Sequence, residues 1–347
     1  MSDVSLARKL ARDFMLYGTA APLLRLDPGL PSRPGATAPL PAAIAIGAFD
    51  GVHRGHRQLL DGLIADARAR GVEAIAVTFD PDPDTVVAPA PAPKLMTRHD
   101  RLAALARSGV DRVVVVPFTP KLAALDHRAF FDDVLGRILD IRSVHVGSNF
   151  RLGAHGAGTV EVLKRWGEEH GIAVTGHELV WEDGSAISAT RIRELIAQGD
   201  LPEAHRLLGR PYAVRGTVVH GRGKGTGMGF PTANVARSEL IQMPADGVYA
   251  GWTLVPGMHG DPDVAYPAAV NVGLPPMFAN DPSSATLEAT LLGFSGDLYG
   301  REVTVLFTER LRPPIHFSSI GELVSAVRGN IEDVRQQLGN KGVSLAR

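Results

Sequence analysis

The sequence lacks cysteine altogether and has little excess charge of either sign. Without cysteine, disulfide bonds and metal sites built on thiolates are excluded. The 36 Lys and Arg residues nearly balance the 37 Asp and Glu residues, so the net charge is -1 and no broad positive field attracts nucleic acid or an anionic membrane. We therefore expect no nucleic-acid partner, and bound phosphate must be held by local groups of side chains.

Long apolar runs are also missing. No uncharged stretch reaches the roughly 18 residues that a membrane span needs, and no secretory apolar region is found near the N-terminus. Together with the missing cysteine, this favours a cytoplasmic protein with no membrane partner. The sequence leaves open whether the chain forms a homo-oligomer.

The chain has enough material for two domains, since 45% of its 347 residues are hydrophobic. Residues 1–41 contain a weakly amphipathic segment followed by Pro/Gly/Ala-rich sequence, which predicts a flexible lead-in. A linker is expected near residues 200–212. The predicted domains are therefore 42–205 and 206–347.

In the first domain, Val/Ile-rich runs alternate with helical patterns. Continuous apolar runs separated by helices are typical of a parallel sheet covered on both faces, so we predict a doubly wound α/β fold. The expected strands are 43–46, 74–78, 112–116, 144–146 and 173–175. The expected helices are 54–70, 98–107, 127–139, 159–170 and 190–198.

The second domain has short strands separated by Gly and Pro clusters. This pattern predicts a small antiparallel β-barrel, followed by a C-terminal helix over residues 320–338. The expected strands are 212–220, 247–253, 268–272, 285–294 and 302–309.

A glycine-rich stretch from Gly47 to His56 follows the first predicted strand directly. At this point the carboxyl edge of a parallel sheet meets the next helix, and open α/β sheets bind ligands there. Its glycines allow backbone N–H groups to approach a phosphate, and the start of the helix favours an anion. His53 and His56 share one side of the first helical turn and can donate hydrogen bonds to phosphate oxygens. The stretch predicts nucleotidyl transfer; the alternative is a solvent-facing histidine pair.

Two further segments carry groups that suit phosphate. Before the predicted helix at 190–198, Ser188 and Thr190 can cap its start while Arg191 and Arg193 can reach phosphate oxygens, although an ordinary capped helix is the alternative. Residues 221–234 form a glycine-dense stretch with basic side chains, which indicates either a phosphate-wrapping loop or a flexible turn.

Phosphoryl transfer to an alcohol also needs a carboxylate that accepts the hydroxyl proton. Glu288, on a predicted strand, is the candidate, with a solvent-facing strand residue as the alternative.

The motifs resemble, in their order, those of the bifunctional bacterial riboflavin kinase/FMN adenylyltransferase (FAD synthetase) family. The stretch G-x-F-D-G-x-H-x-G-H is similar to that of the HxGH nucleotidylyltransferases, and the resemblance extends from about Ala43 to the C-terminus. The other motifs that carry it are Thr78-Phe79-Asp80-Pro81, Val146 to Gly153, Ile187 to Arg193, and Gly229-Phe230-Pro231-Thr232-Ala233-Asn234.

The resemblance implies that the second domain phosphorylates riboflavin to FMN and that the first adenylylates FMN to FAD, releasing pyrophosphate. It implies ATP, riboflavin and FMN as substrates and Mg²⁺ as the metal. The implied catalytic residues are His53, His56 and Glu288. Implied ATP or phosphate contacts are Gly47, Phe49, Asp50, Gly55, Ser188, Thr190, Arg191, Arg193, Gly221, Lys224 and Gly229. Implied flavin contacts are Asn149, Phe150 and Arg151, and the implied Mg²⁺ ligands are Thr232 and Asn234.

The sequence departs from the family pattern at several residues, among them Asp82, Ala189, Thr226 and Met277. Asp82 replaces a usual His, Ala189 a Ser, Thr226 an Arg and Met277 a Thr. A carboxylate at residue 82 repels phosphate unless a cation intervenes. Two alternatives therefore stay open: a divergent paralogue with one active domain or a different nucleotide or alcohol substrate, and a flavin- or nucleotide-binding regulator without turnover.

Overall fold

The computed structural model describes residues 3–26, 38–220, 231–237, 240–273 and 287–345. Within these residues the chain forms two compact units. The N-terminal unit extends from Gly18 to Ser188, except for the segment Pro93–Thr97. The C-terminal unit contains that segment, the N-terminal residues up to Tyr17, and the chain from Ala189 onward.

The N-terminal unit is built on an all-parallel, six-stranded sheet in the order β1-β4-β3-β2-β5-β8. Its strands are β1 (Leu23–Arg25), β2 (Leu40–Ile46), β3 (Glu73–Asp80), β4 (Arg112–Pro117), β5 (Leu139–Gly147) and β8 (Ala173–His177). The inner strands are runs of small and branched apolar residues that are buried on both faces, as a parallel sheet requires. The predicted α/β fold is confirmed.

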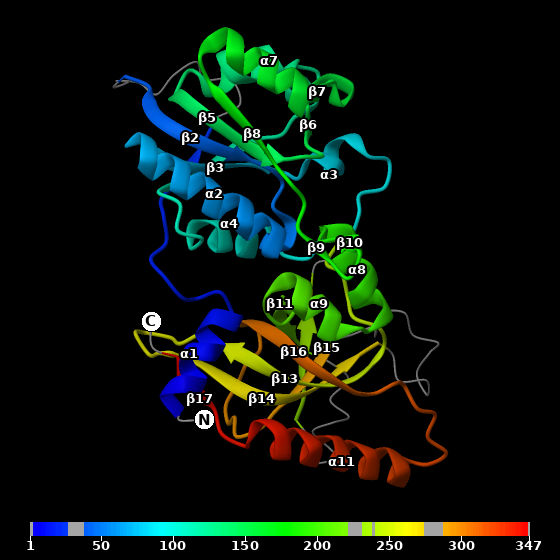
Figure 1. Cartoon of the computed structure of the whole chain (residues 1–347). Helices are drawn as coiled ribbons and strands as arrows, with labels where there is room; N and C mark the ends of the chain where they lie inside the picture. Colours follow the sequence, from blue (N-terminus) through cyan, green and yellow to red (C-terminus); the bar gives the residue numbers. More distant parts are fainter. Residues whose placement is uncertain (1–2, 27–37, 221–230, 238–239, 274–286, 346–347) are drawn as a thin grey trace. The chain divides into compact units, whose positions relative to one another are not determined.

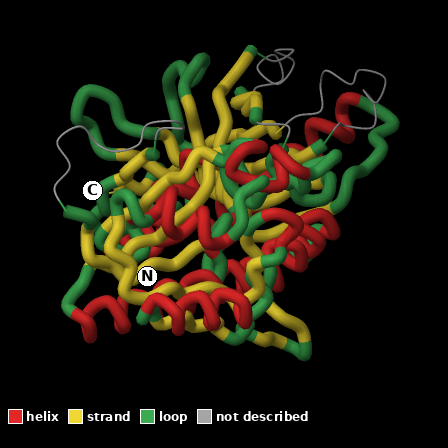
Figure 2. Tube along the Cα trace, turned by 90° about the horizontal axis from the view of Figure 1, so that it is seen from above, coloured by secondary structure: helices red, strands yellow, loops and turns green. Residues whose placement is uncertain are grey.

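Helices cover both faces of this sheet, with α2 and α4 on one side and α7 on the other (Figure 1). The helices of the unit are α2 (Arg54–Arg70), α3 (Pro83–Val87), α4 (Arg98–Ala106), α5 (Pro120–Ala123), α6 (His127–Ala129) and α7 (Val160–His170). Shorter turns and strands are η1 (Asp50–Val52), η2 (Phe130–Leu135), η3 (Ala154–Gly156), β6 (Arg151–Leu152), β7 (Gly158–Thr159), β9 (Trp181–Glu182) and β10 (Ser185–Ala186). The alternation of strands, in yellow, and helices, in red, can be followed in Figure 2.

One predicted helix, over residues 127–139, is shorter and irregular. It becomes π-helical in η2 and ends at Gly136, whose N–H donates to the Phe131 carbonyl. This geometry puts Phe131 in the core, where its ring stacks on Trp166 of α7 with centroids 4.2 Å apart. Core packing therefore overrides the regular helix that the sequence favours, and Leu139 already belongs to β5.

The strand order reverses at β2, which lies between β3 and β5. From β2 the chain continues to β3 and β4 on one side and later returns to β5 and β8 on the other. In open α/β sheets, ligands bind at the carboxyl ends of the strands that flank such a reversal. The segments that leave β2 and β5 are those beginning at Gly47 and Gly147, so the topology brings both motifs to this edge.

The C-terminal unit contains a closed antiparallel barrel. Its described strands run in the order β13-β16-β11-β12-β15-β14, and β14 pairs back with β13 while β17 extends the sheet from β14. The strands are β11 (Ala213–Val219), β12 (Ala233–Ala236), β13 (Gly247–Val255), β14 (Asp263–Val272), β15 (Leu287–Leu291), β16 (Glu302–Arg312) and β17 (Val343–Leu345). Helix α11 (Ile320–Leu338) lies beside the barrel (Figure 1), so the predicted barrel and closing helix are confirmed.

Among the described residues of the C-terminal unit there are three further helices: α1 (Asp3–Asp13), α8 (Ala189–Gln198) and α9 (Leu201–Leu208). The sequence predicts a flexible lead-in, but α1 and the turn after it bury Leu10 and Phe14 in an apolar cluster with Trp252 and Leu306. The apolar side of this short helix is therefore a packing surface. Residues 27–37 of the lead-in lie outside the described residues.

Candidate active sites

The two histidines of the glycine-rich stretch lie against each other at the start of α2. His53 is the N-cap residue, and its Nδ1 accepts a hydrogen bond from the His56 N–H at 3.4 Å. Because Nδ1 accepts, His53 carries a proton on Nε2. The two rings stack with centroids 3.7 Å apart, and the edge of Phe49 meets the His56 ring at 5.3 Å.

Burial sets the charge of the His56 ring. Removal of the His56 ring from water lowers its pKa well below the usual value, and the neighbouring His53 lowers it further. His56 is therefore neutral at pH 7 in the ligand-free protein. Its Nδ1 is buried without a hydrogen-bond partner in the structure. A neutral imidazole with an unsatisfied nitrogen at the positive end of a helix suits an incoming anion.

Two glycines make room for these rings. A Cβ on Gly55 would lie 3.2 Å from Nδ1 of His53, and a Cβ on Gly47 would lie 3.2 Å from the Phe49 ring. Phe49 itself has a left-handed backbone, with φ of 55°, and is buried together with Asp50. The spacing of glycines in the stretch thus follows from side-chain packing as well as from backbone freedom.

The departure from the family pattern at residue 82 has a direct partner. Asp82 forms an ion pair with Arg101 of α4, whose side chain is only 3% exposed. The same guanidinium donates to the carbonyl oxygens of Ala48 at 2.9 Å and Phe79 at 2.8 Å. A cation therefore does intervene at this carboxylate.

The expected flavin motif forms the turn that leaves β5. The Ser148 N–H donates to the carbonyl of His177 at 2.8 Å, which ties the turn to the end of β8. Asn149 is exposed, and Phe150 is half-buried against the core of the sheet. Arg151 starts the short strand β6 and contacts the carbonyl of Gly156 at 3.4 Å.

The segment Ile187 to Arg193 does not belong to one unit. Ser188 ends the N-terminal unit, whereas Thr190, Arg191 and Arg193 lie on α8 in the C-terminal unit. Arg193 donates to the Thr190 hydroxyl at 3.0 Å, so these two side chains are neighbours.

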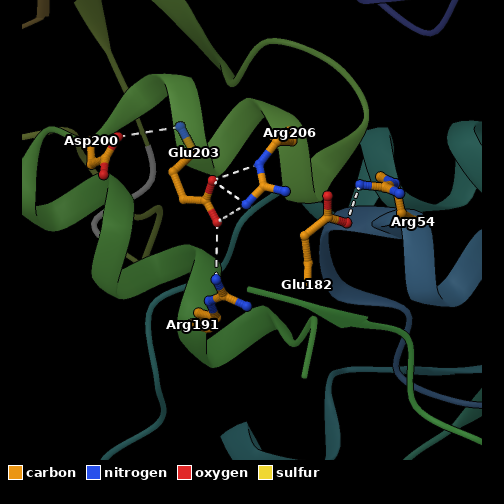
Figure 3. A network of polar contacts seen from close by, with 6 residues as sticks. All are labelled: Arg54, Glu182, Arg191, Asp200, Glu203 and Arg206. Carbon is orange, nitrogen blue, oxygen red and sulfur yellow. Dashed lines mark hydrogen bonds and ion pairs between the residues drawn. The ribbon is translucent and has the colours of Figure 1, made fainter. Parts of the chain in front are cut away.

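Arg191 is engaged by a carboxylate on the next helix, as Figure 3 shows. It donates to Glu203 of α9 at 3.0 Å, and Arg206 donates twice to the same carboxylate, at 2.7 Å and 2.8 Å. A phosphate bound at Arg191 would have to compete with Glu203. A second ion pair in Figure 3, within the N-terminal unit, joins Arg54 of α2 to Glu182 of β9 at 2.5 Å.

In the barrel, strand register brings three polar side chains together. Glu288 on β15 lies directly opposite Asn234 on β12 and opposite Asn271 on β14. Directly opposite residues of antiparallel strands project to the same face, with Cβ atoms about 5 Å apart. All three are partly exposed, whereas their neighbours along the strands, such as Ala289 and Val270, are buried. Thr232 directly precedes β12.

Some predicted site residues lie outside the described part of the chain. These are Gly221, Lys224 and Gly229, together with the two departures Thr226 and Met277. Within the described ranges, no helix is long and apolar enough to cross a membrane. The same ranges contain no group of three or more His, Cys, Asp or Glu placed to hold a metal ion.

The sequence analysis missed Arg101 and Asn271 as site neighbours. Only the strand register shows that Asn271 flanks Glu288. Arg101 carried one signal: it lies four residues before Leu105 and next to Leu102, on the apolar face of α4.

Paired histidines at the ligand-binding edge of an α/β sheet, and a barrel with a glutamate between two asparagines, define a two-part enzyme that transfers phosphorus-containing groups. The FAD synthetase family model matches residues 36–191, and the riboflavin kinase family model matches residues 208–338. The chain belongs to the bifunctional riboflavin kinase/FMN adenylyltransferase family.

Curated relatives agree with this assignment, and a solved structure is similar in fold. The bifunctional riboflavin kinase/FMN adenylyltransferase of Escherichia coli K12 is 37% identical over 297 residues, which cover 85% of this chain and 92% of that protein. The Pseudomonas fluorescens protein of the same name is 35% identical, with coverage of 84% and 91%. A crystal structure described as a macrolide-efflux protein from Streptococcus pneumoniae covers 90% of this chain and 98% of its own, with a TM-score of 0.74 and 28% identity.

Proposed function

We propose that this chain makes FAD in two steps. The C-terminal domain transfers the γ-phosphoryl group of ATP to riboflavin, giving FMN, and the N-terminal domain transfers AMP from a second ATP to FMN, releasing pyrophosphate. The observation that carries the proposal is the stacked pair of His53 and His56 at the start of α2, in a chain of this family. The proposed domains are residues 42–205 and 206–347, and the proposed location is the cytoplasm.

For adenylylation, the histidine pair is proposed to bind the triphosphate. Nε2–H of His53 can donate to a phosphate oxygen while its Nδ1 stays bound to the His56 backbone. The negative triphosphate would raise the pKa of His56, so that a proton on its ring offsets charge as pyrophosphate leaves. Gly47, Phe49, Asp50 and Gly55 shape this end of the site. Ser188, Thr190, Arg191 and Arg193 are proposed as further phosphate contacts.

The flavin of FMN is proposed to contact Asn149, Phe150 and Arg151 at the carboxyl end of β5. This end lies beside that of β2, which is paired with β5 in the sheet. The attacking phosphate and the α-phosphate of ATP can therefore meet at the strand reversal, where holding both reactants in place supplies much of the rate.

For phosphorylation, Glu288 is proposed to accept the proton of the riboflavin hydroxyl as the phosphoryl group moves. The hydroxyl of Thr232 and the amide oxygen of Asn234 are hard oxygen donors, which suit Mg²⁺ together with phosphates and water. When bound, Mg²⁺ would offset the phosphate charge. Gly221, Lys224 and Gly229 are proposed to wrap the phosphates.

A product assay tests the proposal. The full chain is incubated with riboflavin, ATP and Mg²⁺, and flavins are separated by chromatography. Wild type is expected to give FMN and FAD, His56→Ala to stop at FMN, and Glu288→Ala to make FAD only when FMN is added. Folded wild-type protein that forms neither product would refute the proposal, and FMN without FAD would instead favour a paralogue with one active domain.

A further inference from the structure

Arg101 is an almost fully buried cation beside the glycine-rich stretch from Gly47 to His56. Its guanidinium contacts three acceptors on three different segments: the carbonyl of Ala48, the carbonyl of Phe79 at the end of β3, and the carboxylate of Asp82. Its Nε is buried without a hydrogen-bond partner. A planar guanidinium can hold several acceptors in a fixed arrangement, which a lysine cannot do.

Burial makes this cation depend on nearby carboxylates. Desolvation lowers the pKa of Arg101, and the negative charges of Asp50 and Asp80 oppose that shift. Asp82 is the carboxylate in direct contact. Although Asp82 is the N-cap residue of α3, its side chain makes no capping hydrogen bond there. The carboxylate thus serves Arg101, because a buried charge without a partner is strongly destabilising.

The carbonyl oxygen of Ala48, to which Arg101 donates, belongs to the glycine-rich stretch that carries the two histidines. Ala48 lies between Gly47 and Phe49, and its carbonyl also accepts a weaker hydrogen bond from the Thr78 hydroxyl at 3.4 Å. Phe49, the next residue, has the left-handed backbone and the ring that meets His56. The guanidinium therefore connects β3 and α4 to the backbone that leads into the histidine pair.

We propose that Arg101 is a positioning residue for adenylylation and that Asp82, where relatives usually have His, is its buried counter-ion. The inference rests on the proposed FAD synthesis. It accounts for the carboxylate at residue 82 by an ion pair within the site: Asp82 neutralises Arg101, and Arg101 in turn screens Asp82 from the phosphates. A histidine at residue 82 would leave the guanidinium without its contacting carboxylate.

The test uses the full chain and measures kcat and KM for FAD formation from FMN and ATP. Arg101→Met is expected to lower kcat on the order of 100-fold, since a shift of about 1 Å in a catalytic loop has effects of that size, with KM for FMN changed much less. Arg101→Lys, which keeps the charge but not the fork of donors, is expected to lose roughly tenfold. Asp82→His is expected to lower FAD formation rather than to improve it.

A double-mutant cycle shows whether Asp82 and Arg101 act on FAD formation as a pair or independently. In the double variant Asp82→His with Arg101→Met, the combined loss is expected to be at least about tenfold smaller than the product of the single losses. Arg112→Met is the matched control. Arg112 forms a two-pronged pair with Glu73 at 3.0 Å where β3 and β4 begin, at the opposite end of these strands from the loop. The Arg112→Met substitution removes an ion pair of the same sheet and should leave kcat for FAD formation unchanged.

Thermal unfolding of each preparation, followed by circular dichroism, reports whether the N-terminal unit is folded, whereas riboflavin kinase activity reports only on the C-terminal unit. Arg101→Met with wild-type kcat, or Asp82→His with raised FAD formation, would overturn the inference while leaving the proposed function intact. Equal losses in Arg101→Met and Arg112→Met would also overturn it, because the role would then be only structural. Wild type that forms no FAD would overturn the proposed adenylylation as well.

Discussion

The position of the His53 ring depends on the absence of a side chain at residue 55. Gly55 has ordinary helical backbone, so its glycine is not required by φ, but the space that a Cβ would occupy is filled by the His53 ring. His53 cannot move away freely, since it caps α2 and stacks on His56. Because Gly55 has only a hydrogen in place of a side chain, the His53 ring can occupy this space and stack on His56.

Gly55→Ala should consequently impair adenylylation without unfolding the chain. The new methyl group lies 3.2 Å from the ring, so the ring must shift by a few tenths of an ångström. We expect FAD formation from FMN to fall roughly tenfold to 100-fold, by kcat, because misplaced catalytic groups have effects of this order. Steady-state kinetics on FMN and ATP measure it.

Gly329→Ala is the matched control for this substitution. Gly329 lies within α11, and nothing is within 4 Å of the position of its Cβ. Alanine there should stabilise the helix by up to about 1 kcal/mol and leave both activities unchanged. If Gly55→Ala retains wild-type kcat, the steric account of this glycine is wrong.

Three elements of the N-terminal unit are joined by a chain of polar side chains. Asp66 of α2 accepts hydrogen bonds from Ser143 at 2.5 Å and from Nε2 of His145 at 3.1 Å, and Nδ1 of His145 is 2.8 Å from Nε2 of His177. Since the carboxylate can only accept, His145 carries a proton on Nε2, and its Nδ1 faces Nε2 of His177. The chain links α2, β5 and β8.

Gly62 of α2 makes this network possible, because a Cβ there would lie 2.6 Å from the His177 ring. The backbone of His177 in turn holds the turn after β5, through the Ser148 N–H. Burial, and then the neighbouring His145, lower the pKa of His177, which keeps it neutral at pH 7. The network therefore fixes the strand ends at which the flavin is proposed to bind.

Asp66→Asn should destabilise the N-terminal unit in a pH-dependent manner. Partial burial raises the pKa of Asp66, but hydrogen bonds from Arg70, Ser143 and His145 outweigh this and lower it to about 2. A depressed pKa stabilises the folded state above the ordinary value of about 3.9, and this stabilisation is lost as the pH falls toward 2. The free energy of unfolding of the wild type should exceed that of the variant by roughly 1 kcal/mol at pH 5 to 7, because solvent screens part of the interaction at this incompletely buried carboxylate.

Urea unfolding followed by tryptophan fluorescence at pH 7, 5 and 3 measures this difference. The gap between wild type and Asp66→Asn should shrink at pH 3. Asp61→Asn, an exposed position on the same helix, should show no such change. A gap that stays constant with pH would mean that the ionisation of Asp66 does not contribute to stability.

Elements with clear end signals could be predicted from the sequence. The bounds of α2 were predicted as Arg54–Arg70, since a His cap precedes it and Gly71, with φ of 68°, ends it. The bounds of α11 were also predicted, because Ser319 caps its start: the Ser319 hydroxyl accepts from the Glu322 N–H at 3.2 Å, and the Glu322 carboxylate accepts from the Ser318 N–H at 2.8 Å. The short strands β1, β12 and β17 were missed, since their few residues carry no periodicity of their own.

The site residues fall into the same two groups, those that the sequence predicts and those that only the structure reveals. Residues within short motifs, such as His53 and His56, were found because their spacing along one helix turn brings them together. Partners from distant segments were not found: the contacts of Asp82 with Arg101 and of Asp66 with His145 depend on strand order and side-chain packing. The departure at residue 82 could be noted in the sequence, but its counter-ion could not.

At the scale of the whole molecule, the first and last described elements belong to the same unit. Helix α1 packs with β17, which pairs with β14 of the barrel. The N-terminal residues and the chain after Ala189 therefore form one compact unit, and the parallel sheet is built from the sequence between them. The predicted lead-in contributes core residues to the barrel unit rather than serving only as a flexible extension.

Leu10→Ala should therefore weaken the barrel unit although it lies far from the barrel in sequence. Leu10 is 1% exposed and packs with Trp252, Leu254 and Leu306, so its truncation leaves a cavity. We expect a loss of about 2–4 kcal/mol and a fall of roughly 5–10 °C in the temperature at which riboflavin kinase activity is lost on heating. Val4→Ala, on the same helix but 64% exposed, should leave that temperature unchanged. If both variants behave as wild type, α1 does not stabilise the barrel in solution; if both lose stability equally, the loss is not specific to the packing of Leu10 on the barrel.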